Sequence, residues 1–142
     1  MVSRYRARIS GPLLDRLDLH VPVARVPYQE LADPGVTEES PGMRERVREA
    51  RALQQGRFRP RAGIHCNGQM GPGEIRTFCK ASPAVARLLQ RALDHLKLSA
   101  RAYHRILKVA RTVADLDGRG DIDSSHIAEA IQYRCLDRAS PL

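Results

Sequence analysis

Apolar residues recur at helical spacing through the last two thirds of the chain, and capping signals divide them into separate helices. Ser82-Pro83 predicts a helix start, because a serine N-cap followed by proline at the first helical position is a typical opening. The helix 83–97 carries apolar residues three and four positions apart. Ser99 caps the next helix, which we expect to end at Gly118. The sequence therefore predicts consecutive amphipathic helices in this region.

Three further helices follow from the same signals. Ser40-Pro41 opens a helix over about 42–57, whose narrow apolar stripe comprises Met43, Val47, Ala50 and Leu53. Gly71-Pro72, with Glu74 at the third helical position, predicts a short helix to about Cys79. Asp123 caps the last helix, whose inner face comprises Ile127, Ala130, Ile131 and Cys135. The predicted fold class is all-α: a small bundle of four main helices and a short one.

The first 40 residues follow a different pattern. Apolar residues alternate over 17–26, in "LDLHVPVARV", and several prolines and a glycine come after them. One strand cannot bury its own face, so a strand here needs a sheet outside the chain. We expect an extended arm over 1–40 that lacks stable structure alone, and a separate domain over 41–142. That arrangement predicts a piece of a larger protein.

The charge of the chain points to anionic partners. The formal net charge is +8 and the isoelectric point about 10.1. Residues 43–62 hold seven arginines and two glutamates, and residues 82–118 hold seven basic residues and three aspartates. Such a balance is typical of proteins that meet nucleic acid or phosphates, although a simple solvated basic surface fits it equally well.

Recognisable catalytic and metal-binding motifs are missing from the sequence. It has no GxxxxGK[ST] phosphate loop, and its five histidines form no HExxH pattern. Cys66, Cys79 and Cys135 match no zinc spacing, so we expect free thiols in a reducing cytosol. The sequence shows neither a transmembrane-length apolar run nor a signal peptide. We expect a cytoplasmic chain with no activity, metal or cofactor of its own.

The helix over 99–118, "LSARAYHRILKVARTVADLDG" with its preceding leucine, combines an apolar face with a cationic one. Ile106, Val109, Ala110 and Val113 are core candidates by periodicity. The cationic face comprises Arg101, His104, Arg105, Lys108 and Arg111. Guanidinium groups suit phosphate, but a solvated face gives the same pattern. Arg101 stands in the first turn, where the helix dipole disfavours a cation and would favour a phosphate.

Three stretches resemble a known family. "RISGPLLDRLDLHVPV", "LSARAYHRILKVARTVADLDG" and "HIAEAIQYRCLDR" are similar to the C-terminal part of the Mg-chelatase-like AAA+ ATPases of the YifB and ComM competence type. The resemblance covers nearly the whole chain. It implies that residues 1–40 end an AAA+ core and that residues 41–142 form its helical lid.

The resemblance also implies site residues. Arg16 matches an arginine finger that acts on ATP in a neighbouring subunit, and Arg101 matches a sensor-2 phosphate contact. The alternatives are an ion pair of Arg16 with Asp15 or Asp18, and a plain surface arginine at 101. DNA or subunit contacts are expected at a further set of basic residues: Arg105, Lys108, Arg111, Arg44, Arg48 and Arg51.

At the level of function, the resemblance implies a lid that couples ATP binding and hydrolysis to motion of a homohexameric ring on DNA, in competence or recombination. ATP and Mg²⁺ would serve the full-length protein, and the isolated chain would be a monomer without a membrane partner. Two alternatives remain: a basic helical module that binds nucleic acid without sensing nucleotide, and the motor subunit of a true magnesium chelatase.

Overall fold

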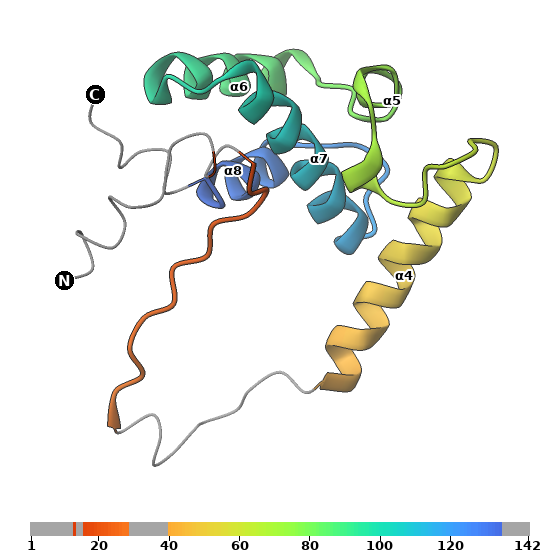
Figure 1. The fold of residues 1–142 in the computed structure, drawn as a ribbon, viewed down its shortest axis with the longest axis horizontal. Helices are drawn as coiled ribbons and strands as arrows, with labels where there is room; N and C mark the ends of the chain where they lie inside the picture. Colours follow the sequence, from red (N-terminus) through yellow and green to blue (C-terminus); the bar gives the residue numbers. More distant parts are fainter. Residues whose placement is uncertain (1–12, 14–15, 29–39, 135–142) are drawn as a thin grey trace.

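The computed structural model describes Leu13, residues 16–28 and residues 40–134. Within these ranges the chain forms five α-helices and one short 3-10 helix (Figure 1). They are α4 (Ser40–Phe58), η1 (Asn67–Gln69), α5 (Pro72–Phe78), α6 (Pro83–Leu96), α7 (Ala100–Leu116) and α8 (Ser124–Gln132). The described residues contain no strand, only an isolated bridge between Ala81 and Ile122. The predicted all-α class is confirmed.

The predicted caps set the helix starts. The Ser82 hydroxyl accepts a hydrogen bond from the Val85 N–H, and the Ser99 hydroxyl accepts one from the Ala102 N–H, at 3.3 and 3.2 Å. The Asp123 carboxylate accepts the N–H groups of Ser125 and His126. Each cap satisfies a backbone donor that the first helical turn leaves unpaired. The sequence therefore located these starts to within a residue.

Helix α7 lies at the centre of the core. It packs against α8, α4, α5 and η1, while α6 packs on α8. Ile106, Ala110 and Ala114 of α7 are almost fully buried, together with Leu89 of α6 and Ile127 of α8. Small alanines on the inner face of α7 let its neighbours approach closely. The predicted core positions of this helix are confirmed, with Val109 partly buried at the margin.

The predicted helix is confirmed as α4, but most of its apolar stripe is exposed. Met43, Val47 and Leu53 are 45%, 51% and 46% exposed, and only Ala50 of that set is buried. The other buried residues of α4 are Gln54 and Phe58. In Figure 1 the N-terminal half of α4 points away from the other helices, so none of the described helices covers Met43 or Val47.

The N-terminal arm lies mostly outside the described residues, as does Cys135. Within 16–28 the backbone forms no strand, but His20 reaches the bundle. Its N–H donates to the Tyr133 carbonyl at 2.7 Å, and its side chain is buried. Residues 21–28 are exposed. The division of the chain at residue 40 stays a prediction, but the structure shows that residues on its two sides are in contact.

Candidate functional site

The arginines of α4 and α7 fall into a buried group and an exposed group. The buried group surrounds Asp115, whose side chain has no solvent exposure. Arg57 donates to both Asp115 oxygens, at 2.7 and 2.5 Å, and the Arg111 Nε donates to Oδ1 at 3.1 Å. The Asn67 amide adds a donor to Oδ2 at 2.8 Å. One buried carboxylate therefore joins α4, η1 and α7.

The DNA or subunit contact expected at Arg111 stays a prediction, and the structure shows this residue engaged inside the chain. Arg111 is 2% exposed, and its two terminal nitrogens donate to the carbonyls of Gly120 and Arg119 at 2.7 and 2.6 Å. With the bond to Asp115, each of the three guanidinium nitrogens has a hydrogen-bond partner. It cannot reach DNA or another subunit without breaking the cluster, because burial of an unpaired charge is costly. Periodicity placed Arg111 on the cationic face, but it could not show which segments pack on that face.

Lys108 and Arg105 are also engaged within the chain. The Lys108 ammonium donates to the Gly68 carbonyl at 2.9 Å. The side chains of Lys108 and Arg105 are half-buried. The Arg105 Nε lies 3.4 Å from Asp18 Oδ1. The predicted cationic face of α7 is therefore largely tied to neighbouring segments, and the DNA or subunit roles of these two residues stay predictions.

Arg101 differs from the other cations of α7. It is exposed in the first turn, behind the Ser99 cap, and it forms no hydrogen bond or ion pair with a described residue. The first turn contains no acidic residue. A cation at this end of a helix faces the positive end of the dipole, so an anion bound there would stabilise both. The geometry suits a phosphate.

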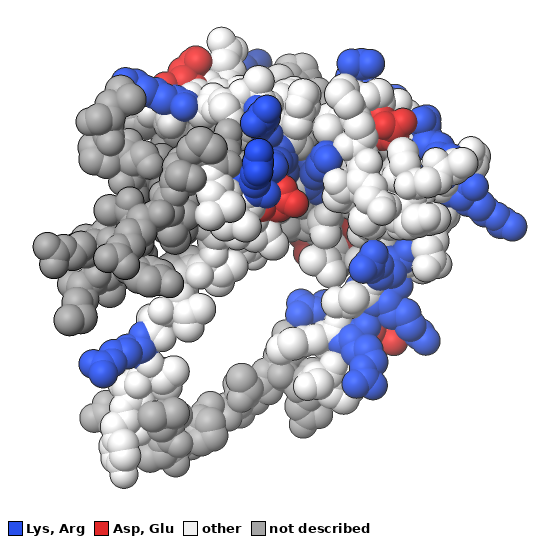
Figure 2. All heavy atoms as spheres, viewed as in Figure 1, with Lys and Arg blue, Asp and Glu red and all other residues white. Residues whose placement is uncertain are grey.

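The remaining candidates on α4 lie at the surface. Arg44 and Arg48 are exposed on the protruding N-terminal half of the helix, and Arg51 is exposed just after its middle. Figure 2 shows basic side chains gathered over that half, with little acidic surface between them. Arg48 pairs with Glu45 at 2.7 Å in an exposed contact one turn away. Such a pair contributes little to stability, so these arginines are available to a partner.

Arg16 is exposed in a turn that precedes residues 17–20. Its N–H donates to the Leu13 carbonyl at 2.9 Å. Of the two alternative partners for its side chain, Asp18 faces Arg105, and Asp15 lies outside the described residues. The structure leaves the finger role of Arg16 as a prediction.

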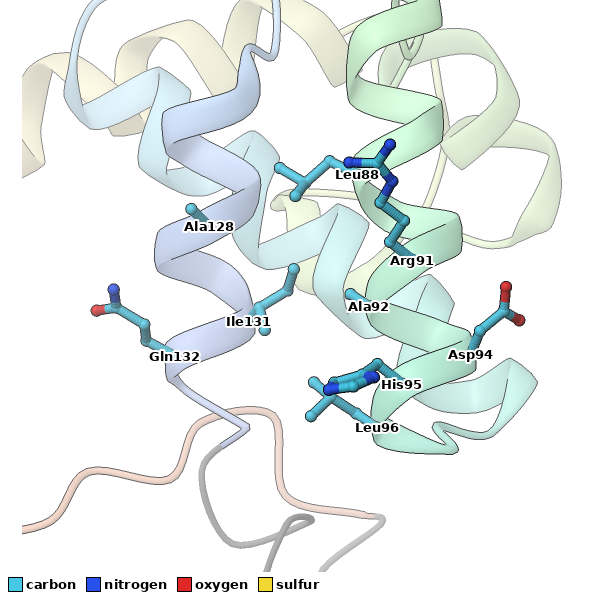
Figure 3. Close-up of a pocket in the computed structure, with 9 residues that line it drawn as sticks. All are labelled: Leu88, Arg91, Ala92, Asp94, His95, Leu96, Ala128, Ile131 and Gln132. Atoms are coloured by element: carbon cyan, nitrogen blue, oxygen red, sulfur yellow. The ribbon is translucent and has the colours of Figure 1, made fainter.

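A hollow lies between α6 and α8 and contains none of the predicted site residues. It has a volume of about 790 Å³. Figure 3 shows Leu88, Ala92 and Ile131 turned into the space between the two helices, while Asp94 and Gln132 lie at its outer edges. The lining offers no convergent set of polar groups, so it gives no indication of a catalytic centre.

Sequence reasoning missed the buried polar cluster as a whole. Asn67 lies in a segment predicted as loop, and the Gln54 side chain accepts its N–H at 3.1 Å. The only signal for this cluster was the four-residue spacing of Arg111 and Asp115, which allows an ion pair along one helix face. The described residues contain no group of three metal-ligating side chains, and none of their helices is long and apolar enough to cross a bilayer.

Comparison with known proteins places the chain in a family. The model of the magnesium chelatase subunit ChlI C-terminal domain matches residues 37–134, and the model of magnesium chelatase subunit ChlI matches residues 1–31. The chain belongs to the magnesium chelatase ChlI C-terminal family. The resemblance drawn from the sequence is confirmed.

Individual members of the family cover nearly all of the chain. Competence protein ComM of Haemophilus influenzae is 44% identical over 138 residues, which are 96% of this chain and 26% of that protein. The uncharacterised protein YifB of Escherichia coli is 41% identical over 136 residues, 95% of this chain and 26% of its own length. The uncharacterised protein Rv2897c of Mycobacterium tuberculosis is 35% identical over 131 residues, 92% and 26%. The chain spans about a quarter of these relatives.

Proposed function

We propose that the chain is the helical lid of a Mg-chelatase-like AAA+ ATPase and couples ATP binding and hydrolysis to movement of a ring on DNA. The observation that carries the proposal is Arg101, exposed at the capped start of α7 and without a partner among the described residues. Membership of the magnesium chelatase ChlI family supports a nucleotide-dependent role. The proposal includes a homohexamer in the cytoplasm and, from the name of the relative ComM, a role in competence.

The start of α7 offers a contact that suits one phosphate of ATP. Arg101 would bind a phosphate together with the free N–H groups of the first turn of α7. A cation alone at this position loses about 0.3–1 kcal/mol to the helix dipole, and a bound phosphate would reverse that loss. Mg²⁺ supplies neutralisation of the phosphate charge when bound, and its ligands would come from outside the described residues. Arg16 would stabilise the charge that develops on a neighbour's γ-phosphate.

Substitution of the two arginines in the full-length protein tests the proposal. We expect Arg16→Ala to lower ATP turnover by about 1,000-fold or more, in the range known for arginine fingers. Arg101→Ala should also remove most turnover and weaken nucleotide binding. Circular dichroism and thermal melts should match the wild type, because both side chains are exposed. Arg87→Ala, an exposed arginine of α6, is the control. Near-normal turnover in both variants would refute the assignment.

A second candidate function is direct binding of nucleic-acid backbone by α4. This helix presents Arg44, Arg48 and Arg51 to solvent. Contacts of arginine with phosphate give affinity without sequence reading and fall steeply with salt. This candidate needs no nucleotide and applies to the isolated chain.

Fluorescence anisotropy of the isolated chain with labelled DNA distinguishes the second candidate. Replacing all three arginines by glutamine should weaken binding and lower the slope of log K against log salt by about three, one unit for each lost phosphate contact. An Arg87→Gln, Arg91→Gln double variant on α6 controls for net charge. Absence of binding by the wild-type chain at moderate salt would rule the second candidate out.

A further inference from the structure

The residues after Arg16 are held in the corner between α7 and the end of α8. The Leu17 carbonyl accepts a hydrogen bond from the Arg134 guanidinium, and the His20 N–H donates to the Tyr133 carbonyl at 2.7 Å. His20 and Arg134 are 3% and 1% exposed. From Val21 onward the segment is exposed, so contact with the bundle ends at His20. Two backbone groups thus fix residues 17–20 to α8.

A side-chain contact fixes the same residues to α7. The Arg105 Nε lies 3.4 Å from Asp18 Oδ1, and the Arg105 side chain is only 21% exposed. Its Nη1 atom is buried and has no hydrogen-bond partner among the described residues. The Asp18 side chain is 63% exposed, so the half-buried guanidinium, with its Nη1 donor unmet, is the fixed partner that attracts the carboxylate. Asp18 is the carboxylate paired with it.

Arg105 also stands one helical turn after Arg101. Four residues of α-helix rise about 6 Å, and residues four apart share a face. Arg101 and the anchor for Asp18 therefore belong to one rigid element. Arg16 precedes the first anchored residue directly, so its position depends on how residues 17–20 sit against α7 and α8.

We propose that residues 17–20 form a latch that holds the Arg16 turn on the α7–α8 corner, with Arg105 as a positioning residue for Arg16. The proposal rests on the proposed function, in which Arg16 and Arg101 each meet a nucleotide. When Arg101 binds phosphate and α7 shifts, the Asp18–Arg105 pair carries the shift to Arg16. The latch thus couples the nucleotide at one subunit's Arg101 to hydrolysis of the nucleotide that its Arg16 serves.

Steady-state ATP hydrolysis by the full-length protein tests the positioning role. Arg105→Met should lower kcat by about 10- to 100-fold, because small misplacements of a catalytic group have effects of that size. The KM for ATP should stay within about twofold, since the contact serves the transition state rather than binding. Asp18→Asn should act in the same direction. The exchanged pair Asp18→Arg with Arg105→Asp should recover most of kcat, which a loss of folding would not allow. Arg87→Met is the matched control.

Hydrogen exchange of the isolated chain tests the latch without any catalytic readout. In Arg105→Met the His20 amide should exchange at least about tenfold faster, because the hydrogen bond to Tyr133 opens more often. The amide of Ala130, in the buried part of α8, should be unchanged and reports that the bundle remains folded. Unchanged exchange at His20 would overturn the latch.

The outcomes separate the latch from the function on which it rests. If Arg16→Ala removes turnover while Arg105→Met and Asp18→Asn leave kcat within about twofold, the positioning role is wrong and the finger assignment stands. If Arg16→Ala leaves turnover intact, both the finger and the positioning role are wrong. Loss of kcat with rescue by the exchanged pair, together with faster exchange at His20, supports the proposal.

Discussion

The arginines of α4 and α7 fall into two groups, one paired inside the fold and one exposed to solvent. Where α4 meets α7, the half-buried Arg57 and the buried Arg111 share the carboxylate of Asp115. Elsewhere, Arg44 and Arg48 of α4 and Arg101 of α7 are exposed, and the only ion pair that these three form with a described residue is the exposed one of Arg48 with Glu45. The same side chain thus holds the fold together in one place and is presented to solvent in the other.

The difference shows where charge matters for stability. A buried ion pair makes little net contribution compared with an apolar replacement, but removal of one partner leaves an uncompensated charge inside the protein. An exposed pair can lose either partner with little effect. Substitutions should therefore divide the arginines and their carboxylates into a structural set and a functional set.

The largest expected effect is at Asp115. Asp115→Ala leaves Arg57 and Arg111 facing one another without their carboxylate, and we expect a loss of about 3–5 kcal/mol in the free energy of unfolding. Urea denaturation of the isolated chain measures it. Asp94→Ala on exposed α6 is the control and should stay within about 0.5 kcal/mol of the wild type. A similarly small effect at Asp115 would mean that the buried cluster does not hold α4 on α7.

A smaller effect is expected at the start of α7. Ser99→Ala removes the acceptor for the Ala102 N–H and should lower the free energy of unfolding by about 1 kcal/mol. Ser99→Asn should retain most of the stability, because asparagine is an equally good cap. The measurement is again urea denaturation. Equal losses in both variants would show that the hydroxyl acts through something other than the cap. The cap would then not be what fixes the first turn that carries Arg101.

A near-zero effect is expected at the exposed pair of α4. Arg48→Gln should change the free energy of unfolding by less than about 0.5 kcal/mol, because both side chains of the Glu45–Arg48 pair are more than half exposed to water. Thermal melts at low and high salt provide the measurement. A loss comparable to that at Asp115 would place Arg48 in the structural set and remove the contrast between the two groups of arginines.

The contribution of the protonated Cys79 thiol to stability should be constant around neutral pH and should fall in alkali. Burial raises the pKa of Cys79 from 9.0 to about 11. The folded chain therefore holds this proton more tightly than the unfolded chain, so the contribution to stability is complete below pH 9 and is lost as the pH rises through about 11. Denaturation of wild type and Cys79→Ala across pH 8–11 should show their difference shrinking. A difference in stability that stays constant from pH 8 to 11 would mean that the Cys79 thiol is accessible to solvent in the folded chain.

Much of the fold could be predicted from the sequence because its signals are local. Ser82, Ser99 and Asp123 cap the helices that they were expected to cap. Periodicity identified Ile106 and Ala110 as core. Hydrogen bonds within one turn and the 3.6-residue period require no knowledge of distant residues. The family was also recognisable, because its motifs are continuous stretches of the chain.

The site was only partly predictable. Arg101 and Arg111 lie on one face of one helix by periodicity, yet the first is exposed and the second is buried. The reason is that Arg57 and Asn67 pack over the second half of α7 and not over its first turn. They contact Asp115 although they lie 58 and 48 positions away from it in the sequence. The sequence by itself determined the helices, their caps and the angular position of each arginine. The tertiary structure alone decided which arginines are buried, because burial depends on the elements that pack against a face, and helical periodicity contains no information about them.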